Sequence, residues 1–410
     1  MQAASTLSLP RVLVAAGGIY TAQSTIGGLT FLGLPAALRA SGMAMEHIGL
    51  LSLIMLIWAF KFLWAVPVER WRIRADGGRR TGATVLAGQM IAAAAVAGLG
   101  LLAGYGLPVM LVLLAVMALA SATIDTACDG FLIERVPEGR RGLGNMVQVG
   151  GGYFGMVLGG SLFVWIYARY GWTAAAGVMA GLVLLLSAPL VLLREPFIAA
   201  SQRGASQRAA GGLLAALRRR DMQAGLAMIV AFEAGGRFVQ VLAGPYLVDA
   251  GLPLELVGTL TGAGSVAAGL AGTTGGGLAV QKLGAPRAMQ LVALGQILVI
   301  GLLALAAAMS SASLTLLSAL FVLQMAVMAA GFVVSYSRLM ALASPDQPGA
   351  DFSLVQSASA LTGAVAGVTG GMLAGQFGFP VVFALAAALA LPVPFILARL
   401  EGAISGKSSS

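Results

Sequence analysis

Long apolar runs separated by short polar stretches make up most of this sequence. A run of about 20 apolar residues, wound as a helix, spans the hydrocarbon core of a bilayer. The pattern predicts twelve membrane-spanning helices, at about 12–34, 48–68, 81–104, 107–132, 143–168, 173–193, 223–248, 256–280, 287–308, 313–339, 352–376 and 380–398. We therefore expect an all-α integral membrane protein whose main partner is the lipid bilayer.

The composition agrees with burial in lipid. Of the 410 residues, 59% are hydrophobic and only 10% are charged, whereas soluble globular proteins carry roughly 25% charged residues. The net charge of +9 would by itself suggest a nucleic-acid partner, but the arginines cluster in alternate gaps between apolar runs, at 69–80, 133–142 and 194–222. Positive charge in alternate loops marks the cytoplasmic side. Both termini are therefore expected in the cytoplasm, and no nucleic acid is expected as a partner.

The two halves of the chain resemble each other at an offset near 209 residues. The segment 42–49 (GMAMEHIG) aligns with 251–258 (GLPLELVG), and Gly155 aligns with Gly363. Parallel repeats of this kind build the major facilitator architecture, in which the substrate site lies at the interface of two six-helix bundles.

The stretch between the halves is polar and basic, with few side chains to bury. We expect it to be a cytoplasmic linker at 195–221, which joins one bundle at 1–194 to a second at 222–410. Such a chain is expected to act as a monomer.

Lys61 lies within the apolar run 50–66, where an unpaired ammonium costs about 2.5–3.5 kcal/mol. Asp125 and Asp129 are four residues apart and hence on one face of the fourth helix. At 1.5 Å per residue, Lys61 lies about 12 Å inside the cytoplasmic boundary and the aspartates about 15 and 9 Å, so the three are expected to meet. Two carboxylates against one ammonium leave one Asp able to carry a proton. The alternative is a static cluster that locks the bundle.

Glu233 and Arg237 lie four residues apart on the seventh helix, and Gln240 continues the same face. Glu233 is about 18 Å from the boundary, near the middle of the bilayer. Ionisable groups at that depth are candidates for a binding site. Arg237 suits a substrate carboxylate, because its guanidinium binds one through two parallel hydrogen bonds. The alternative is a pair that satisfies only itself.

Further polar residues within the apolar runs are candidates for the substrate-binding surface: Tyr20, Gln23, Ser24, Tyr153 and Gln324. Each fits an interhelical hydrogen bond equally well. His47 and Cys128 have no metal ligand near them in the sequence. We therefore expect no metal and no cofactor.

Another set is expected to control the gate or to lie between the bundles. The loop between the second and third helices is a loosened form of the major facilitator loop motif, with Glu69, Arg70, Arg79 and Arg80. The alternative is that its arginines only set the topology. The fifth and eleventh helices carry repeat-related positions: Gln148, Gln356, Gly155 and Gly363.

The sequence also bears on the energy source. Gly406-Lys407-Ser408 is its only Gly-Lys-Ser, and Glu401 stands where a phosphate-binding loop needs its first glycine. A secondary transporter is therefore expected, driven by the proton gradient, or else a transporter that needs an external partner. An enzyme is disfavoured, because the sole histidine, His47, lies outside the predicted helices and a hydrolase needs a nucleophile and a base within reach.

The chain resembles major facilitator permeases over nearly its full length, and three segments narrow this resemblance. The segment 56–70 (LIWAFKFLWAVPVER) resembles the Lys-Phe-Leu-Trp-Ala-Pro segment of muropeptide permeases, acetyl-coenzyme A transporters and siderophore permeases of the major facilitator superfamily. The segments 121–130 (SATIDTACDG) and 142–148 (GLGNMVQ) resemble their fourth helix and the entry to their fifth. Val66 is an insertion and Glu69 replaces the usual Asp, but the charge pattern is kept.

Two further segments, 15–24 (AAGGIYTAQS) and 351–356 (DFSLVQ), look most like the siderophore-importing branch, typified by permeases for rhizobactin and pyochelin. The resemblance implies an importer in the bacterial inner membrane that carries a siderophore, with or without ferric iron, into the cytoplasm by alternating access. A small aromatic carboxylate such as pyochelin would suit Arg237.

Three alternatives stay open. The first is a muropeptide permease of the same fold, whose larger cargo needs more polar lining than the sequence offers. The second is an exporter of drugs or metabolites, because residues do not reveal direction. The third is a membrane-embedded enzyme or a sensor, which the internal duplication disfavours.

Overall fold

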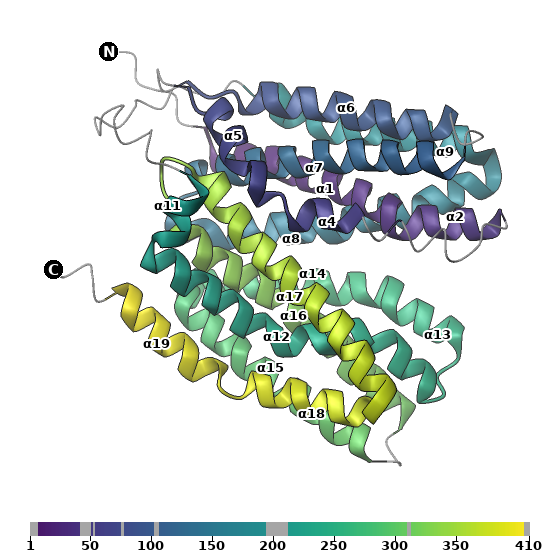
Figure 1. The fold of residues 1–410 in the computed structure, drawn as a ribbon, viewed down its shortest axis with the longest axis vertical. Helices are drawn as coiled ribbons and strands as arrows, with labels where there is room; N and C mark the ends of the chain where they lie inside the picture. The colour runs from purple at the N-terminus through teal and green to yellow at the C-terminus, as the bar shows by residue number, and fades with distance from the viewer. Residues whose placement is uncertain are drawn as a thin grey trace. The chain divides into compact units, whose positions relative to one another are not determined.

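The computed structural model describes residues 7–41, 51, 54–74, 78–101, 106–193, 212–309 and 313–405. Its regular structure in these ranges is helical (Figure 1), and one isolated β-bridge joins Ile73 to Arg79. The first half forms α1 (Leu9–Gly28), the π-helical turn η1 (Leu29–Gly33), α2 (Leu34–Ala40), α4 (Met55–Ala59), α5 (Phe62–Arg72), α6 (Thr81–Leu101), α7 (Leu107–Arg135), η4 (Glu138–Arg140), α8 (Arg141–Val157), the π-helical turn η5 (Leu158–Leu162) and α9 (Phe163–Val191).

The second half is helical in the same way. It forms α11 (Leu213–Arg218), α12 (Arg220–Asp249), α13 (Leu254–Thr259), the π-helical turn η6 (Leu260–Gly264), α14 (Ser265–Leu283), α15 (Ala285–Ala308), α16 (Leu314–Leu339), η7 (Met340–Leu342), α17 (Pro348–Phe377), α18 (Phe379–Ala390) and α19 (Val393–Ser405).

The predicted all-α membrane fold is confirmed. Nine helical stretches in the described ranges are long and apolar enough to cross a membrane. One of them, Glu138–Val191, holds two of the predicted spans, because Gly171 has a φ of 81° that L side chains rarely adopt and turns the chain there. The predicted second span is divided between α4 and α5, and the eighth is interrupted by η6.

The chain forms two compact units. Unit 1 comprises 1–137, 147–216 and 343–353, and unit 2 comprises 138–146, 217–342 and 354–410. This division differs from the predicted bundles in two short segments, 138–146 and 343–353, each of which groups with the unit of the other half. The repeat segment 42–49, with His47, and most of the predicted linker, 194–211, lie outside the described residues.

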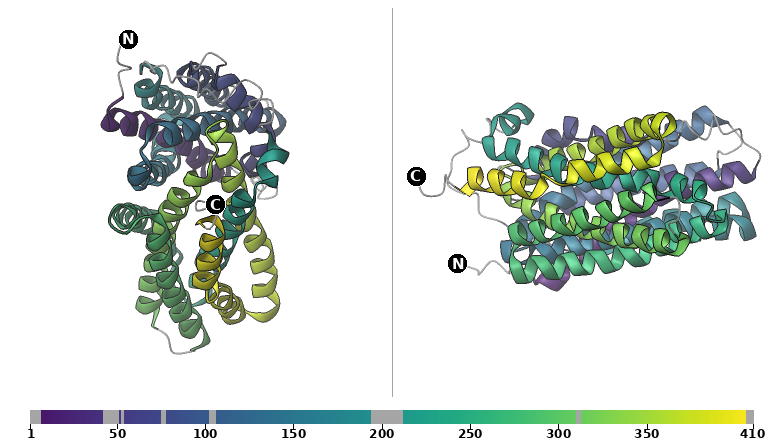
Figure 2. Two further views of the ribbon diagram at one scale, coloured as in Figure 1. Left: turned by 90° about the vertical axis from the view of Figure 1, so that its left-hand side faces the viewer. Right: turned by 90° about the horizontal axis from the view of Figure 1, so that it is seen from below.

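Both units pair their helices by one scheme. In unit 1, α6 packs against α7 and α9, and α1 packs against α9 (Figure 2). In unit 2, α15 packs against α16 and α18, and α12 packs against α18. The helices that pair are equivalent in the two halves, so the packing follows the repeat in the sequence.

Small residues allow a close contact between α1 and α8. A side chain at Gly155 of α8 would collide with the carbonyl oxygen of Thr21 on α1, and one at Gly151 would lie 3.1 Å from the Thr21 hydroxyl. The π-helical turns η1 and η5 continue this contact. Glycines one turn apart let two helix backbones approach closely in a membrane, and here they bring α1 to α8 within unit 1.

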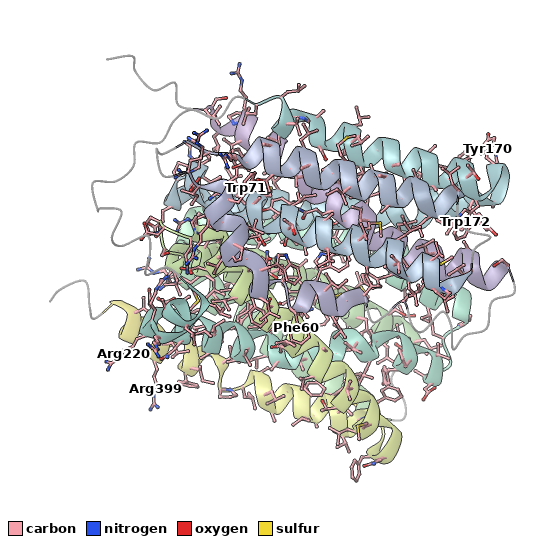
Figure 3. The ribbon with its side chains drawn as sticks, turned by 45° about the horizontal axis from the view of Figure 1, so that its top comes forward. Phe60, Trp71, Tyr170, Trp172, Arg220 and Arg399 are labelled. Carbon is pink, nitrogen blue, oxygen red and sulfur yellow. The ribbon has the colours of Figure 1, made fainter. Side chains whose placement is uncertain are left out.

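Aromatic side chains mark both ends of unit 1. Figure 3 shows Trp71 at one end and Tyr170 at the other. The Arg80 guanidinium lies 4.5 Å from the Trp71 ring, and Arg169 lies 4.9 Å from the ring of Trp165. Exposed aromatic rings with neighbouring cations are typical of the two membrane–water interfaces.

Because α1 and α8 are in close contact, we expect alanine substitutions at Gly155 and Gly152 to differ in their effect on stability. Gly155→Ala should lower the stability of the purified protein by about 1–3 kcal/mol, because the new methyl group has no room and the backbones must separate. Gly152→Ala is the matched control, since its nearest neighbour would be the Ser24 hydroxyl at 3.6 Å. Melting temperatures in detergent compare the two, and equal melting temperatures would contradict the tight contact.

Candidate functional site

A cluster of buried charges lies inside unit 1, at the break between α4 and α5. Lys61 is 2% exposed and stands between Ala59, where α4 ends, and Phe62, where α5 begins. Its ammonium forms an ion pair with Asp125 of α7 and lies 3.8 Å from Oδ2 of Asp129, one turn further along. The structure therefore brings together the three charges that the sequence places at one depth.

Neutral donors complete this cluster. The Tyr20 hydroxyl of α1 donates to Oδ1 of Asp129 at 2.8 Å, and Nε2 of Gln148 on α8 donates to the same oxygen at 3.0 Å. With its amide oriented to match its neighbours, Gln23 of α1 donates to Oδ1 of Asp125 at 2.8 Å. These groups, predicted to face the substrate or the other bundle, are thus occupied by the aspartates.

The cluster has more acidic groups than basic ones. Asp129 is fully buried, and one ammonium faces two carboxylates. Buried ions are stabilised only when they are paired and their remaining lone pairs accept hydrogen bonds. The donors of Tyr20 and Gln148 meet part of that need at Asp129. Proton coupling by Lys61, Asp125 and Asp129 stays a prediction.

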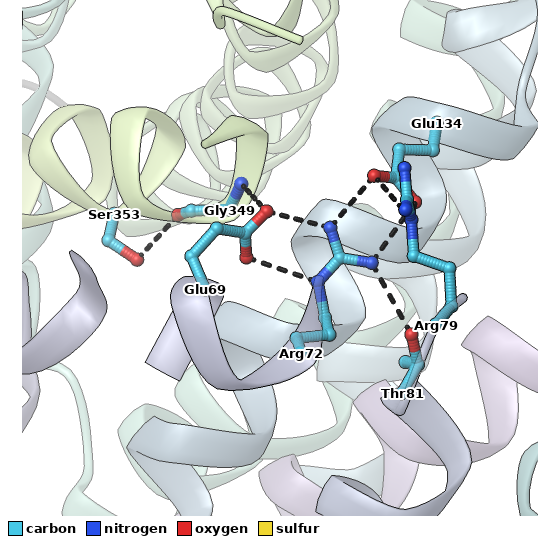
Figure 4. A network of polar contacts seen from close by, with 7 residues as sticks. All are labelled: Glu69, Arg72, Arg79, Thr81, Glu134, Gly349 and Ser353. Atoms are coloured by element: carbon cyan, nitrogen blue, oxygen red, sulfur yellow. Dashed lines mark hydrogen bonds and ion pairs between the residues drawn. The ribbon is translucent and has the colours of Figure 1, made fainter. Parts of the chain in front are cut away.

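A second ionic network lies at the end of α5 in unit 1 (Figure 4). The buried Arg72 donates to Glu69 at 2.7 and 3.1 Å and to Glu134 at 3.0 Å through each of two nitrogens. Nε of Arg79 adds two contacts of 3.1 Å to Glu134, and the Gly349 N–H donates to Glu69 at 3.4 Å. Burial by itself lowers the pKa of Arg72, but the two carboxylates raise this pKa above its ordinary value, so the guanidinium stays charged.

Sequence reasoning found only part of this network. Of the four residues assigned to the gate, Glu69 and Arg79 belong to it. Arg70 is exposed, and Arg80 lies over Trp71. Arg72 and Glu134 were missed. Arg72 follows Glu69 by three residues, and this spacing puts both on one helix face, so the sequence did carry a signal for Arg72.

The charged residues of α12 form the corresponding cluster in unit 2. Glu233 is 1% exposed, and its Oε2 accepts from Nε and a terminal nitrogen of Arg237 at 3.0 and 2.8 Å. The Ser359 hydroxyl of α17 lies 2.7 Å from both groups, and Nη1 of Arg237 donates to Gln240 at 3.1 Å. The guanidinium lies 4.8 Å from the ring of Phe332 on α16. Sequence reasoning missed Ser359 and Phe332, because neither is near α12 along the chain.

The other predicted site residues differ in burial. Ser24, Tyr153 and Gln356 are half-buried, and Gln324 is 3% exposed. A side chain at Gly363 would lie 3.6 Å from the Arg237 guanidinium within unit 2, as Gly155 meets α1 within unit 1. Substrate contacts by Ser24, Tyr153 and Gln324, and interbundle contacts by Gln356 and the two glycines, stay predictions.

Metal ligands are not grouped in the described ranges. No three His, Cys, Asp or Glu side chains there are arranged to hold a metal ion. Cys128 is a buried free thiol beside the Asp129 cluster.

Comparison of sequences identifies relatives. The pattern of the Major Facilitator Superfamily matches residues 12–317. The anhydromuropeptide permease of Escherichia coli is 28% identical over 263 residues, which are 62% of this chain and 52% of that protein. The chain therefore aligns with about half the length of this relative. An uncharacterised protein of Haemophilus influenzae is 24% identical over 380 residues, 88% of this chain and 87% of its own.

Solved transporters share the fold. The fucose:proton symporter of E. coli, in a variant form, superposes with a TM-score of 0.73 at 14% identity, over 96% of this chain and 98% of its own. A bacterial homologue of the iron transporter ferroportin, soaked with iron, superposes with a TM-score of 0.71 at 17% identity, over 96% and 100%. At these identities the likeness concerns the fold alone.

The ion pairs of Lys61 with Asp125 and Asp129, here called the Lys61 cluster, can be tested with a double-mutant cycle. Lys61→Met should destabilise the protein by about 3–5 kcal/mol, because it leaves buried carboxylates without their cation. Adding Asp125→Asn should restore much of that loss, since it removes the uncompensated charge. Thermal unfolding of the two single variants and the double variant measures the coupling. Strictly additive losses would show that the ion pair is not the stabilising contact.

Proposed function

The chain belongs to the major facilitator superfamily, and on that premise we propose that it is a secondary transporter that imports a carboxylate-bearing siderophore by alternating access. The proposed location is the bacterial inner membrane, with both termini in the cytoplasm, and the proposed driving force is the proton gradient. The alternating clusters of arginine along the sequence support this orientation.

The observation that carries the proposal is the arginine in the middle of α12. Arg237 is held by Glu233 and Ser359, and its guanidinium lies over the ring of Phe332. A fixed guanidinium beside an aromatic ring suits a small aromatic acid, which can accept paired hydrogen bonds through its carboxylate and pack its ring. A pyochelin-like molecule, with or without ferric iron, has this chemistry.

The Glu233 carboxylate beside Arg237 could be replaced as the partner of Arg237 by a carboxylate of the cargo. Glu233 neutralises Arg237 when no cargo is bound. A cargo carboxylate that takes its place would leave Glu233 buried without its cation, which favours protonation of Glu233. In unit 1, the Lys61 and Asp129 cluster is a second place where a proton can be held. Binding of an anion and uptake of a proton would therefore favour each other.

A second cargo has a specific observation behind it. The E. coli relative is named as an anhydromuropeptide permease. An anhydro-sugar peptide also carries carboxylates for Arg237, but its sugars need many hydrogen-bonding groups. The described side chains of unit 2 around Arg237 offer Ser359 and Gln240. This sparse polar lining is the reason that we place the siderophore first.

Uptake assays separate the two cargoes. Cells with and without the gene would receive radioactive iron bound to pyochelin or to another siderophore, or labelled anhydromuropeptide. We expect uptake of ferric siderophore to require the gene and to stop when the proton gradient is collapsed. Gene-dependent uptake of the muropeptide alone would replace the first cargo by the second. Gene-dependent loss of preloaded cargo would indicate export.

The role of Arg237 is tested with a charge-neutral change. The double variant Arg237→Ala with Glu233→Gln keeps the net charge and should reduce uptake about tenfold or more, because charge-assisted hydrogen bonds contribute about 1.5–3 kcal/mol. Arg169→Ala is the control, since Arg169 also lies over an aromatic ring but is exposed in unit 1. Normal uptake by a double variant that reaches the membrane in normal amounts would rule out this role.

A further inference from the structure

Several buried side chains of unit 2 have polar atoms that make no hydrogen bond within the part of the chain that the structure describes, and three of them come from α12, α15 and α16. They are Oε1 of Glu233, both amide atoms of Gln324 and Nε2 of Gln296. Glu233 is 1% exposed and the two glutamines are each 3% exposed. Each such orphaned group costs about 1–3 kcal/mol when it is left without a partner, so a partner is expected.

Glycines on the facing helices let both amides approach the neighbouring backbone closely. A side chain at Gly236 of α12 would meet Sδ of Met328 at 2.9 Å and Nε2 of Gln324 at 3.5 Å. A side chain at Gly331 of α16 would lie 3.1 Å from Nε2 of Gln296, which comes from α15. The absence of side chains at these two positions leaves each amide facing a neighbouring helix.

Glu233 lies within reach of the first of these amides. It precedes Gly236 by three residues on α12, and residues with that spacing have Cβ atoms about 5–6 Å apart. The Gln324 amide adjoins Gly236, and Glu233 lies one helical turn from that glycine on α12. A water molecule in a protein interior is held by two to four polar groups, and two amide atoms with one carboxylate oxygen supply that number.

We propose that unit 2 holds internal water between α12, α15 and α16, which bonds the Gln324 amide to Oε1 of Glu233 and gives protons a route to this carboxyl group. Gln296 binds water at a second position beside Gly331. The proton route deepens the proposed function and rests on it, whereas the presence of the water does not. Gln324 thereby becomes a positioning residue for water instead of a ligand of the cargo.

The charged surroundings of Glu233 are simple in the described ranges. Arg237 of α12 is its ion-pair partner, and the residues of α17 in unit 2 and those of α18 include no titratable side chain. On α15, α16 and α19, which pack against α12, the titratable groups are Arg287 at the start of α15, Tyr336 and Arg338 near the end of α16, and Arg399 and Glu401 on α19. Arg338 pairs with Glu401 at 2.6 Å. The Arg237 pair and the proposed water therefore act on Glu233 most directly.

The same feature recurs in the other repeat. Gly88-Gln89 of α6 corresponds to Gly295-Gln296 of α15, at an offset of about 207 residues, close to the repeat. Gln89 is 1% exposed, and both its amide atoms lack a partner among the described residues. Gln89 therefore offers a matched control for Gln324. Its amide is also buried and without a hydrogen-bond partner among the described residues, but it lies on α6 in unit 1.

The water is tested by X-ray radiolysis of the full-length protein in nanodiscs, followed by mass spectrometry. Hydroxyl radicals formed from internal water oxidise the side chains beside it, and Met328 is the oxidisable neighbour of Gln324. We expect Met328 to be oxidised several-fold faster than Met179, which is fully buried in an apolar cluster of unit 1. The excess should disappear in Gln324→Leu and persist in Gln89→Leu. Equal rates for the two methionines, or an excess that Gln324→Leu leaves unchanged, would overturn the proposal.

The link to Glu233 is tested without any cargo. A lipophilic carbodiimide reacts with protonated carboxyl groups in membranes, and its adduct on Glu233 can be counted by mass spectrometry as the pH is varied, with Glu233→Gln as the blank. The pH of half-maximal modification should shift by about one unit or more in Gln324→Leu, because a water bond changes the balance between the two protonation states. Gln89→Leu should leave it unchanged. A midpoint that Gln324→Leu does not move would refute the proton route even if transport is confirmed.

Discussion

Burial of ionised groups inside helices that face lipid is the constraint on which the rest of this structure depends. Lys61, Arg72 and Glu233 are each at most 2% exposed, and the cost of an isolated buried ion is several kcal/mol. Two of them are stabilised by a carboxylate on another helix. Lys61 pairs with Asp125 of α7, and Arg72 pairs with Glu134 of α7. These two charges therefore link helices as well as binding their counter-ions.

The close packing of small residues brings hydrogen-bond donors to one of these buried clusters. The contact of Gly155 with α1 brings α1 and α8 together, and Tyr20 of α1 and Gln148 of α8 then donate to one oxygen of Asp129. The two units share their pairing of helices but not their chemistry. The Lys61 cluster of unit 1 gathers its charges from several helices, whereas the Glu233–Arg237 pair of unit 2 takes both of its charges from α12.

The fold by itself leaves the cargo undetermined. Solved proteins that superpose on this chain include a sugar symporter and a homologue of an iron transporter, at 14% and 17% identity. One architecture thus accommodates different solutes, because function lies in side chains carried by the fold. In this chain the selectivity that we propose lies in Arg237 and its neighbours Ser359 and Phe332.

The sequence by itself determined the helical membrane fold, because apolar runs of sufficient length have few alternatives in lipid. It also indicated that Lys61 would meet Asp125 and Asp129, since depth along helices can be counted from residue spacing. Only the tertiary structure decided which helices face each other. It therefore placed Ser359 beside Glu233 and joined Arg72 to Glu134. Contacts between residues far apart in the chain depend on helix rotation and crossing, which hydrophobic periodicity does not specify when a helix is apolar on every side.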